Sequence, residues 1–233
     1  MTPTKLMTDL KALAGGPNEM PFPKFGSIAR LNREVVLTEK IDGTNALVQI
    51  TRVPLGTSID FSVPPFIRAW IDDTKVDESG MPTYELILRA GSRSRWISPD
   101  DDNFGFAKWV KTNAQELLKL GVGNHYGEWY GQGIQRNYGL SYKCFALFNV
   151  AKWGDPWVRP TCCDVVPVLS RVNGSELSEA VEREVRHLRD FGSVAVPGFM
   201  KPEGVVVFHT AANQLFKITL EDDEVPKSLV GKS

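Results

Sequence analysis

The chain has 233 residues, of which 42% are hydrophobic and 24% are charged. That length and composition fit one large domain or two small ones, with enough apolar side chains for a core. The formal net charge of -1 excludes a globally basic nucleic-acid-binding protein, so contacts with nucleic acid would have to come from local basic patches.

The first predicted elements are a helix and a hairpin. Leucines recur at helical spacing before a pair of glycines, which predicts a short helical extension over about residues 1–20. Lys40 stands between the apolar runs 35–37 and 46–50, with a glycine to reverse the chain, and this pattern predicts a hairpin. Residues 53–82 are rich in Pro, Asp and Ser, which predicts an irregular insertion between strands.

The rest of the chain alternates irregularly between strands and helices. Amphipathic helices are predicted at 106–120 and 177–188, each followed by a glycine. Apolar runs predict strands at 84–90, 125–130, 143–150, 204–208 and 215–220. No βαβ rhythm repeats, so we expect an α+β fold of mainly antiparallel sheets flanked by helices.

Lys40 is the first candidate for chemistry. It lies in Glu-Lys-Ile-Asp-Gly-Thr-Asn, residues 39–45, at the end of a predicted strand and two residues before Asp42. A lysine held on a strand end beside a carboxylate suits a nucleophile. The same residue types also form ordinary surface turns, so partners elsewhere in the chain decide the meaning of this one.

Five further polar segments lie at predicted strand ends. They are Ser92-Arg93, Gly127-Glu128, Cys144 to Asn149, Glu203-Gly204 and Phe216-Lys217-Ile218. With residues 39–45, this ordered series resembles the motifs of the covalent nucleotidyltransferase superfamily, which includes ATP-dependent RNA and DNA ligases and mRNA capping enzymes. Residues 39–45 are most similar to the phage-type double-strand RNA ligase branch. The resemblance covers about residues 34–221 and implies an ATP-grasp-like nucleotidyltransferase domain.

On this resemblance, Lys40 attacks the α-phosphate of ATP and becomes lysyl-AMP. Asp42 and Glu203 match the carboxylates that hold Mg²⁺ or Mn²⁺ at that phosphate. A free lysine has a pKa of roughly 10.4, so a nearby cation must favour the unprotonated amine. Lys217 or the metal ion is the candidate for that cation.

The resemblance also implies the contacts of the nucleotide. Arg93 matches the arginine that contacts the nucleotide and later the nucleic-acid phosphate, with Arg95 as an alternative on the same strand face. Glu128 matches the residue that binds the ribose hydroxyls. Phe148 matches the aromatic side chain that stacks on adenine, although Phe145 is an alternative and the two face opposite ways.

Glu39 and Asn45, beside the nucleophile, resemble base- and phosphate-contacting residues of the RNA ligase branch. Other positions differ from the family pattern. The last motif usually carries two lysines separated by one residue, whereas here Thr219 follows Lys217. The motif of the stacking phenylalanine usually continues with aspartate, and here the residue is Asn149.

Only a short tail follows the last motif. DNA ligases and capping enzymes carry an oligonucleotide-binding barrel there, and many RNA ligases carry a helical domain. Residues 221–233 have room for neither, so we expect a single adenylyltransferase domain over residues 1–233 without a C-terminal barrel.

These residues favour an ATP-dependent RNA ligase that transfers AMP from Lys40 to a 5′-phosphate and seals it to a 3′-hydroxyl. The partners would be nucleic-acid ends or nicks, with RNA favoured, and basic residues near 89–95 and 108–111 would guide the phosphates. A minimal DNA ligase is one alternative. A non-catalytic end-binding module of the same fold is another alternative, because Thr219 stands where the family usually has a second lysine.

The three cysteines indicate the compartment. Cys144, Cys162 and Cys163 make neither a disulfide framework nor a metal-binding spacing. No apolar run is long enough to cross a bilayer. We expect a cytoplasmic monomer that makes no contact with membranes.

Overall fold

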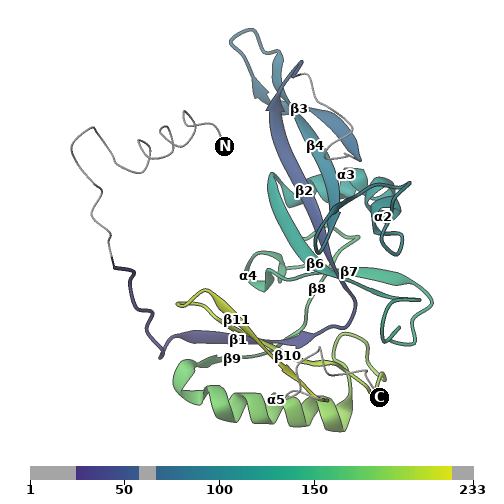
Figure 1. The fold of residues 1–233 in the computed structure, drawn as a ribbon. Coiled ribbons are helices and arrows are strands. Elements are labelled where there is room, and N and C mark those ends of the chain that lie inside the picture. The colour runs from purple at the N-terminus through teal and green to yellow at the C-terminus, as the bar shows by residue number, and fades with distance from the viewer. Residues whose placement is uncertain (1–24, 58–66, 222–233) are drawn as a thin grey trace, which may run out of the picture.

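The computed structural model describes residues 25–57 and 67–221, so the helical extension predicted over residues 1–20 lies outside the described chain. Over the described residues the protein forms a four-stranded and a seven-stranded β-sheet, with helices packed against them (Figure 1). Strand pairs are antiparallel except for one parallel pair. This arrangement confirms the predicted α+β class of mainly antiparallel sheets.

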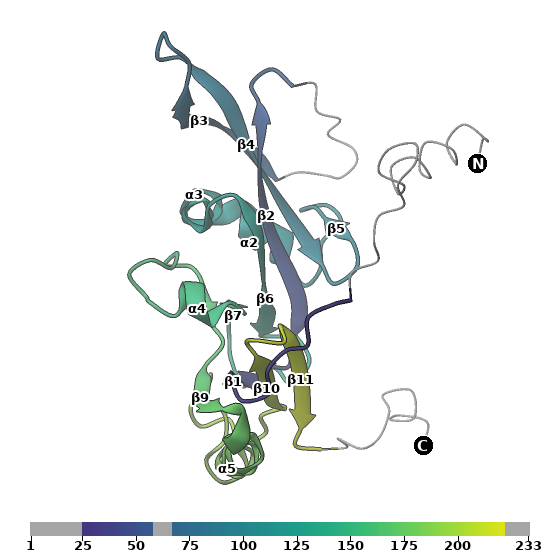
Figure 2. The ribbon, with the colours of Figure 1, turned by 90° about the vertical axis from the view of Figure 1, so that its left-hand side faces the viewer.

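The four-stranded sheet has the order β11-β10-β1-β9. Its strands are β1 (Glu34–Lys40), β9 (Val168–Asn173), β10 (Gly204–His209) and β11 (Gln214–Thr219). Helix α5 (Leu177–Phe191), preceded by a 3₁₀ turn at Gly174–Glu176, covers one face of this sheet (Figure 2). The helix ends at Gly192, whose φ of 82° is a backbone conformation that glycine adopts without steric cost.

Strand alternation divides the residues of this sheet between its two faces. Every second side chain of β1 and β10 points toward α5. The buried cluster on that face consists of Val35, Leu37, Val205, Val207, Ala180 and Leu188. The opposite face of β1, which carries Thr38 and Lys40, is therefore left uncovered by α5.

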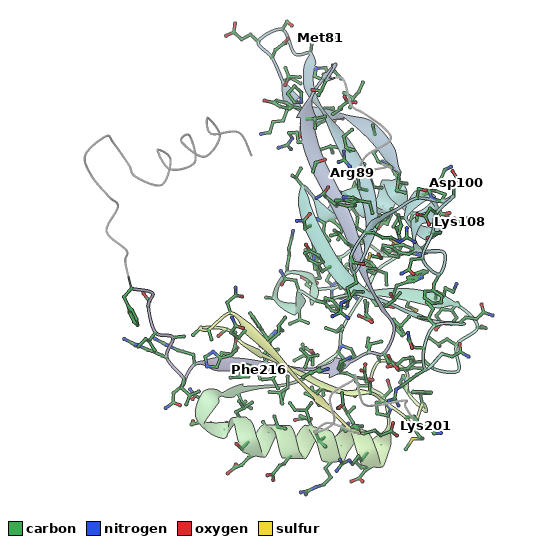
Figure 3. All side chains as sticks on the ribbon, in the orientation of Figure 1. Met81, Arg89, Asp100, Lys108, Lys201 and Phe216 are labelled. Atoms are coloured by element: carbon green, nitrogen blue, oxygen red, sulfur yellow. The ribbon has the colours of Figure 1, made fainter. Side chains whose placement is uncertain are left out.

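The seven-stranded sheet has the order β3-β4-β2-β6-β7-β8, with β5 paired to β4. Its strands are β2 (Thr44–Pro54), β3 (Arg68–Val76), β4 (Pro82–Ser92), β5 (Trp96–Ile97), β6 (Gly123–Gly131), β7 (Lys143–Leu147) and β8 (Asp164–Val165). The turn between β3 and β4, marked by Met81, lies at the end of this sheet that is distant from the four-stranded sheet (Figure 3).

The main hydrophobic core lies between the seven-stranded sheet and a set of short helices. These are α2 (Phe106–Thr112), α3 (Ala114–Leu117) and a 3₁₀ turn at Leu118–Leu120. Their apolar side chains pack against alternate residues of β2, such as Val48 and Ile50, which are fully buried. In the described residues, no helix is long and apolar enough to cross a membrane.

The structure corrects the predicted hairpin around Lys40. β1 pairs with β9 and β10, whereas β2 pairs with β4 and β6, so the two strands belong to different sheets. The segment from Lys40 to Thr44 carries the chain from one sheet to the other. Gly43 is needed in it because a Cβ there would collide with the carbonyl oxygen of Trp129 and lie 2.8 Å from Cβ of Tyr130.

The insertion predicted as irregular over residues 53–82 contains strand β3. The sequence does not predict this strand because one of its buried positions carries a carboxylate, Asp72, which is only 2% exposed. Asp72 tolerates this burial because it accepts hydrogen bonds from the side chains of Arg52 and Thr74 at 2.5 Å each. Hydrogen bonding of Asp72 to Thr74 and the charge of Arg52 lower its pKa, although burial opposes them.

Two other element boundaries also differ from the sequence prediction. The helix predicted over 106–120 is interrupted at Asn113, whose backbone has φ of -97° and ψ of 12°. The strand predicted over 143–150 ends at Leu147, and a one-turn helix, α4 (Val150–Trp153), follows. Asn149 caps that helix, since its side-chain oxygen accepts a hydrogen bond of 3.1 Å from the backbone N–H of Lys152.

Candidate active site

The uncovered faces of the two sheets enclose a cavity of about 950 Å³. The four-stranded sheet contributes Thr38, Lys40 and Lys217 to its lining. The seven-stranded sheet contributes Asn45 and Glu128, which are directly opposite each other on β2 and β6. Of these residues, Lys40, Lys217, Asn45 and Glu128 are predicted site residues from distant parts of the sequence, and the fold brings them to one cavity.

Lys40 and Glu203 form an ion pair at the inner end of this cavity. Lys40 is the last residue of β1 and pairs in register with Gly204 of β10, which places Glu203 beside it. The ammonium of Lys40 donates a hydrogen bond to Oε2 of Glu203. The Lys40 side chain is 22% exposed and that of Glu203 is 9% exposed, so the lysine amine is still accessible from solvent.

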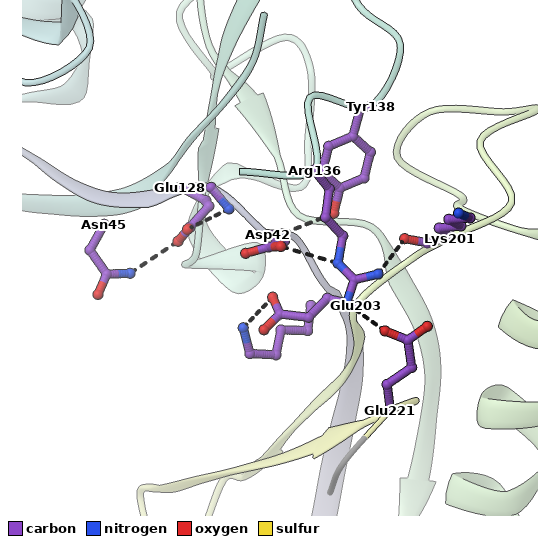
Figure 4. Close-up of polar contacts among 10 residues, drawn as sticks. Asp42, Asn45, Glu128, Arg136, Tyr138, Lys201, Glu203 and Glu221 are labelled. Carbon is purple, nitrogen blue, oxygen red and sulfur yellow. Dashed lines mark hydrogen bonds and ion pairs between the residues drawn. The ribbon is translucent and has the colours of Figure 1, made fainter. Parts of the chain in front are cut away.

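Glu128 is a buried carboxylate on the floor of the cavity. Its Oε1 accepts a hydrogen bond of 3.1 Å from the backbone N–H of Gly43, and its Oε2 accepts one of 3.0 Å from Asn45 (Figure 4). Burial raises the pKa of Glu128 to about 7, against the opposing effects of the Lys40 charge and these two hydrogen bonds. A small change in local charge can therefore switch its protonation near neutral pH.

Asp42 is held by two side chains of the connection between β6 and β7. The backbone N–H of Asp42 donates to the hydroxyl of Tyr138 at 2.8 Å. Its carboxylate accepts a hydrogen bond of 3.1 Å from Nε of Arg136. Asp42 and Glu203 are thus each paired with a cation, Asp42 with Arg136 and Glu203 with Lys40.

The donor set fits a divalent metal ion only in part. In the described part of the chain, no group of three or more His, Cys, Asp or Glu side chains could hold a metal ion. Mg²⁺ is usually held by one or two carboxylates, while waters and substrate phosphates complete its oxygen ligands. The carboxylates of Asp42 and Glu203 are oxygen donors of the kind that Mg²⁺ prefers, and each is paired with a protein cation in this structure.

Glu39 lines the cavity, but its carboxylate is hydrogen-bonded to other residues of the protein. It accepts hydrogen bonds from the Ser193 hydroxyl at 2.6 Å and from the backbone N–H groups of Val194 and Ala195 at 2.8 Å each. Burial raises the pKa of Glu39, and these three hydrogen bonds oppose that effect. A role of the Glu39 side chain in nucleotide contact stays a prediction.

The two candidate stacking residues have different environments. Phe145 is fully buried and packs against the rings of Phe106 and Trp109 at centroid distances of 5.0 and 5.6 Å. Phe148 is 41% exposed and lines the cavity. This places Phe145 in the core and leaves Phe148 as the ring available to a ligand.

Lys217 is exposed, lines the cavity and stands opposite Val206 of β10. Thr219, the position of the missing second lysine, lies two residues further along β11, opposite Gly204. Because alternate residues of a strand share a face, Thr219 and Lys217 point to the same side of the sheet.

The predicted basic residues do not form one patch at the cavity. Arg93 is exposed in the connection after β4 and lies outside the cavity, so its role stays a prediction. Arg95 forms an ion pair of 2.6 Å with Asp101. Arg89 is half-buried on β4 and donates to the hydroxyl of Thr51 at 3.0 Å (Figure 3).

Sequence reasoning missed Arg136, Tyr138 and Ser193. The first two lie in a connection that contains Gly131, Gly133 and Gly139 and that has the composition of an ordinary turn. Their contacts join positions up to 96 residues apart, and no local pattern encodes such distances.

Residues 33–219 match the family model described as RNA ligase. No curated protein sequence matches the chain significantly. Among solved structures, the chain is similar to two single-residue variants of Naegleria gruberi RNA ligase, each with ATP and Mn. Their sequence identities are 16% and 14% and their TM-scores 0.48 and 0.49, over 83% and 87% of this chain and 52% and 58% of theirs.

An archaeal ATP-dependent RNA ligase has 15% identity and a TM-score of 0.45, over 86% of this chain and 48% of its own. The chain therefore spans about half the length of the ligases that it matches.

Proposed function

The chain belongs to the RNA ligase family, and on this basis we propose that it is an ATP-dependent RNA ligase that carries AMP on Lys40. The observation that supports the proposal most strongly is the position of Lys40. Its amine lies in a cavity, hydrogen-bonded to Glu203, with Glu128, Phe148 and Lys217 in the same cavity lining.

In the first step, the lone pair of the Lys40 amine attacks the α-phosphorus of ATP. A P–N bond forms, the P–O bond to the β-phosphate breaks, and pyrophosphate leaves with the bonding electrons. The ammonium must first lose a proton, which passes along its hydrogen bond to Glu203 and on to solvent, so that the carboxylate is again free. Bound Mg²⁺ or Mn²⁺, held by Asp42 and Glu203, would supply charge stabilisation at the phosphate.

The later steps move AMP and then release it. An oxygen of the 5′-phosphate attacks the AMP phosphorus, and the P–N bond to Lys40 breaks. The 3′-hydroxyl then attacks the 5′-phosphate, loses its proton and displaces AMP, which leaves a phosphodiester. The likeness of residues 39–45 to the phage-type branch supports a nick in double-stranded RNA as the substrate.

Each cavity residue has a proposed task. Phe148 stacks on the adenine, because a flat ring exposed in the cavity can pair with a base face. Glu128 binds the ribose hydroxyls, and Asn45, its hydrogen-bond donor, keeps the carboxylate in place. Lys217 faces the phosphates as a point charge.

The first test is labelling with α-labelled ATP and Mn²⁺. We expect label that is stable in alkali and released by acid, as the P–N bond of lysyl-AMP requires, on the wild-type protein and none on Lys40→Ala. Lys75→Ala, which removes an exposed lysine of β3, is the matched control and should label normally. A wild-type protein that takes no label would support the non-catalytic end-binding module instead.

The second test is sealing of nicked duplexes that differ only in the sugar of the 3′-hydroxyl strand. RNA is told from DNA by contacts to the 2′-hydroxyl. We expect faster sealing when that strand is RNA. Equal or faster sealing of the DNA strand would make the protein a minimal DNA ligase.

A further inference from the structure

Arg136 uses three nitrogens of its guanidinium to contact three separate segments of the chain. Its Nε donates to Oδ2 of Asp42 at 3.1 Å, one terminal nitrogen donates to the carbonyl oxygen of Lys201 at 3.1 Å, and the other donates to Oε2 of Glu221 at 3.3 Å (Figure 4). The Arg136 side chain is 24% exposed. Each of the three guanidinium nitrogens therefore has an acceptor.

The three contacted segments are the ends of three neighbouring strands. Asp42 follows β1 and lies two residues after Lys40. Lys201 lies two residues before Glu203, where the chain enters β10. Glu221 lies just beyond β11, four residues after Lys217. Strands β11, β10 and β1 are adjacent in the four-stranded sheet, so one side chain ties together the ends that carry the proposed nucleophile and its partners.

Arg136 itself comes from the other sheet, in the connection between β6 and β7. The residues around it, Gln135, Asn137 and Tyr138, have φ values of 44°, 61° and 52°. Such left-handed backbone persists in non-glycine residues only where the surroundings fix it, and it is found often at functional sites.

The surroundings that fix this connection are present on both sides of Arg136. The side-chain oxygen of Asn137 accepts a hydrogen bond of 3.0 Å from the N–H of Gly133. The ring of Tyr138 is 2% exposed and packs on that of Phe199 at a centroid distance of 4.6 Å. Arg136 therefore lies in a loop whose conformation is held by these contacts.

We propose that Arg136 is a positioning residue for lysine adenylylation, which holds the ends of β1, β10 and β11 so that Lys40, Glu203 and Lys217 meet in the correct geometry. The carboxylate of Glu221 helps to hold the Arg136 guanidinium in this position. This inference rests on the proposed function. Arg136 is not among the residues that line the cavity, so its loss should slow the reaction while ATP binding is kept.

The variants are Arg136→Ala, Arg136→Lys and Glu221→Gln, with Arg183→Ala as the matched control. Arg183 also pairs with a carboxylate, that of Glu184, but on α5 at the opposite face of the sheet. Single-turnover labelling of Lys40 over a range of ATP concentrations separates the maximal rate from the half-saturating ATP concentration.

We expect Arg136→Ala to lower the maximal rate by about 100-fold, because a displacement of about 1 Å has an effect of that order, with half-saturating ATP changed less than about threefold. Arg136→Lys should recover part of the rate, since lysine supplies charge without the planar fork. Glu221→Gln should give a smaller loss, and adding it to Arg136→Ala should cause no further loss.

Amide hydrogen exchange provides a readout that does not depend on ATP. Arg136→Ala should speed exchange in residues 199–205 and 217–221, whereas Arg183→Ala should leave these segments unchanged. An unchanged rate and unchanged exchange in Arg136→Ala would overturn the proposal. If that variant does not fold, Arg136→Lys and Glu221→Gln decide the question by the same measurements. Absence of label on the wild-type protein refutes the proposed function, while exchange still tests the contact.

Discussion

The carboxylate of Glu39, the residue before Lys40, accepts a hydrogen bond of 2.6 Å from the hydroxyl of Ser193, 154 residues later in the chain. With two further bonds from backbone N–H groups, this contact ties the end of β1 to the loop after α5. Glu39 is 1% exposed, so its carboxylate depends on these three donors in place of water. These hydrogen bonds therefore hold the end of β1, the strand that carries the proposed nucleophile, against the loop after α5.

Removal of the Glu39 carboxylate should destabilise the fold. Glu39→Ala removes the acceptor of three hydrogen bonds, and we expect a loss of about 3 kcal/mol in the free energy of unfolding. Ser193→Ala removes one donor and leaves the carboxylate with its other two, so we expect a loss of about 1 kcal/mol. Urea unfolding followed by circular dichroism measures both, and equal losses would contradict this assignment.

Glu128 should make stability depend on pH between its unfolded and folded pKa values. Its pKa rises from 4.5 to about 7, so the folded state binds the extra proton in that range. Stability should therefore fall as pH increases from about 4.5 to about 7, by an amount on the order of 3 kcal/mol. Glu128→Gln cannot titrate and should lose this dependence. Parallel slopes for the two proteins across this range would show that folding does not raise the pKa of Glu128.

Substitution of Phe148 should weaken ATP binding, whereas substitution of Phe145 should lower stability. Phe148→Ala removes an exposed ring, and we expect the half-saturating ATP concentration to rise by about 10- to 100-fold with stability nearly unchanged. Phe145→Ala opens a cavity in the core and should cost about 3–5 kcal/mol. Labelling at varied ATP and urea unfolding measure the two effects. If Phe148→Ala destabilised the protein but left the half-saturating ATP concentration unchanged, Phe148 would be a core residue and not a ligand contact.

A lysine at position 219 should increase the rate of Lys40 labelling. Thr219→Lys adds a cation on the strand face that carries Lys217, close to Glu203 in the β10–β11 pairing. Each 1.4 kcal/mol of added stabilisation of the transition state gives about a tenfold increase in rate. Leu215→Lys places the same charge on the same face but four residues away, and should have a much smaller effect. Equal effects of the two substitutions would indicate a general attraction for ATP.

The polar residues at strand ends could be predicted because the underlying signals are local. Apolar runs locate β1, β6, β10 and β11, and Lys40 and Glu203 lie at strand ends as predicted. Glu128 and Lys217, in contrast, lie inside β6 and β11. The structure brings Lys40, Glu128, Lys217 and Glu203 together at one cavity or its edge. The choice of Phe148 over Phe145 needed the structure, because both faces of that segment are apolar in sequence.

Other features could not be predicted because they depend on distant partners. Hydrophobic pattern locates a strand but does not select its neighbour, so β1 and β2 were paired wrongly. The burial of Asp72 depends on Arg52, and a carboxylate in a polar run gives no sign of such a partner. Asn149 departs from the family pattern, yet its role as a helix cap is visible only once α4 is seen.

The crossing of the chain between the sheets at Lys40–Thr44 has a mechanical consequence. A rotation of one sheet against the other about this segment would move each side chain in proportion to its distance from the axis. The Lys40 amine, beside the axis, would be nearly stationary, whereas Leu215 on the outer part of β11 would travel furthest. Such a rotation would change the width of the cavity while the amine nitrogen of Lys40 kept its place.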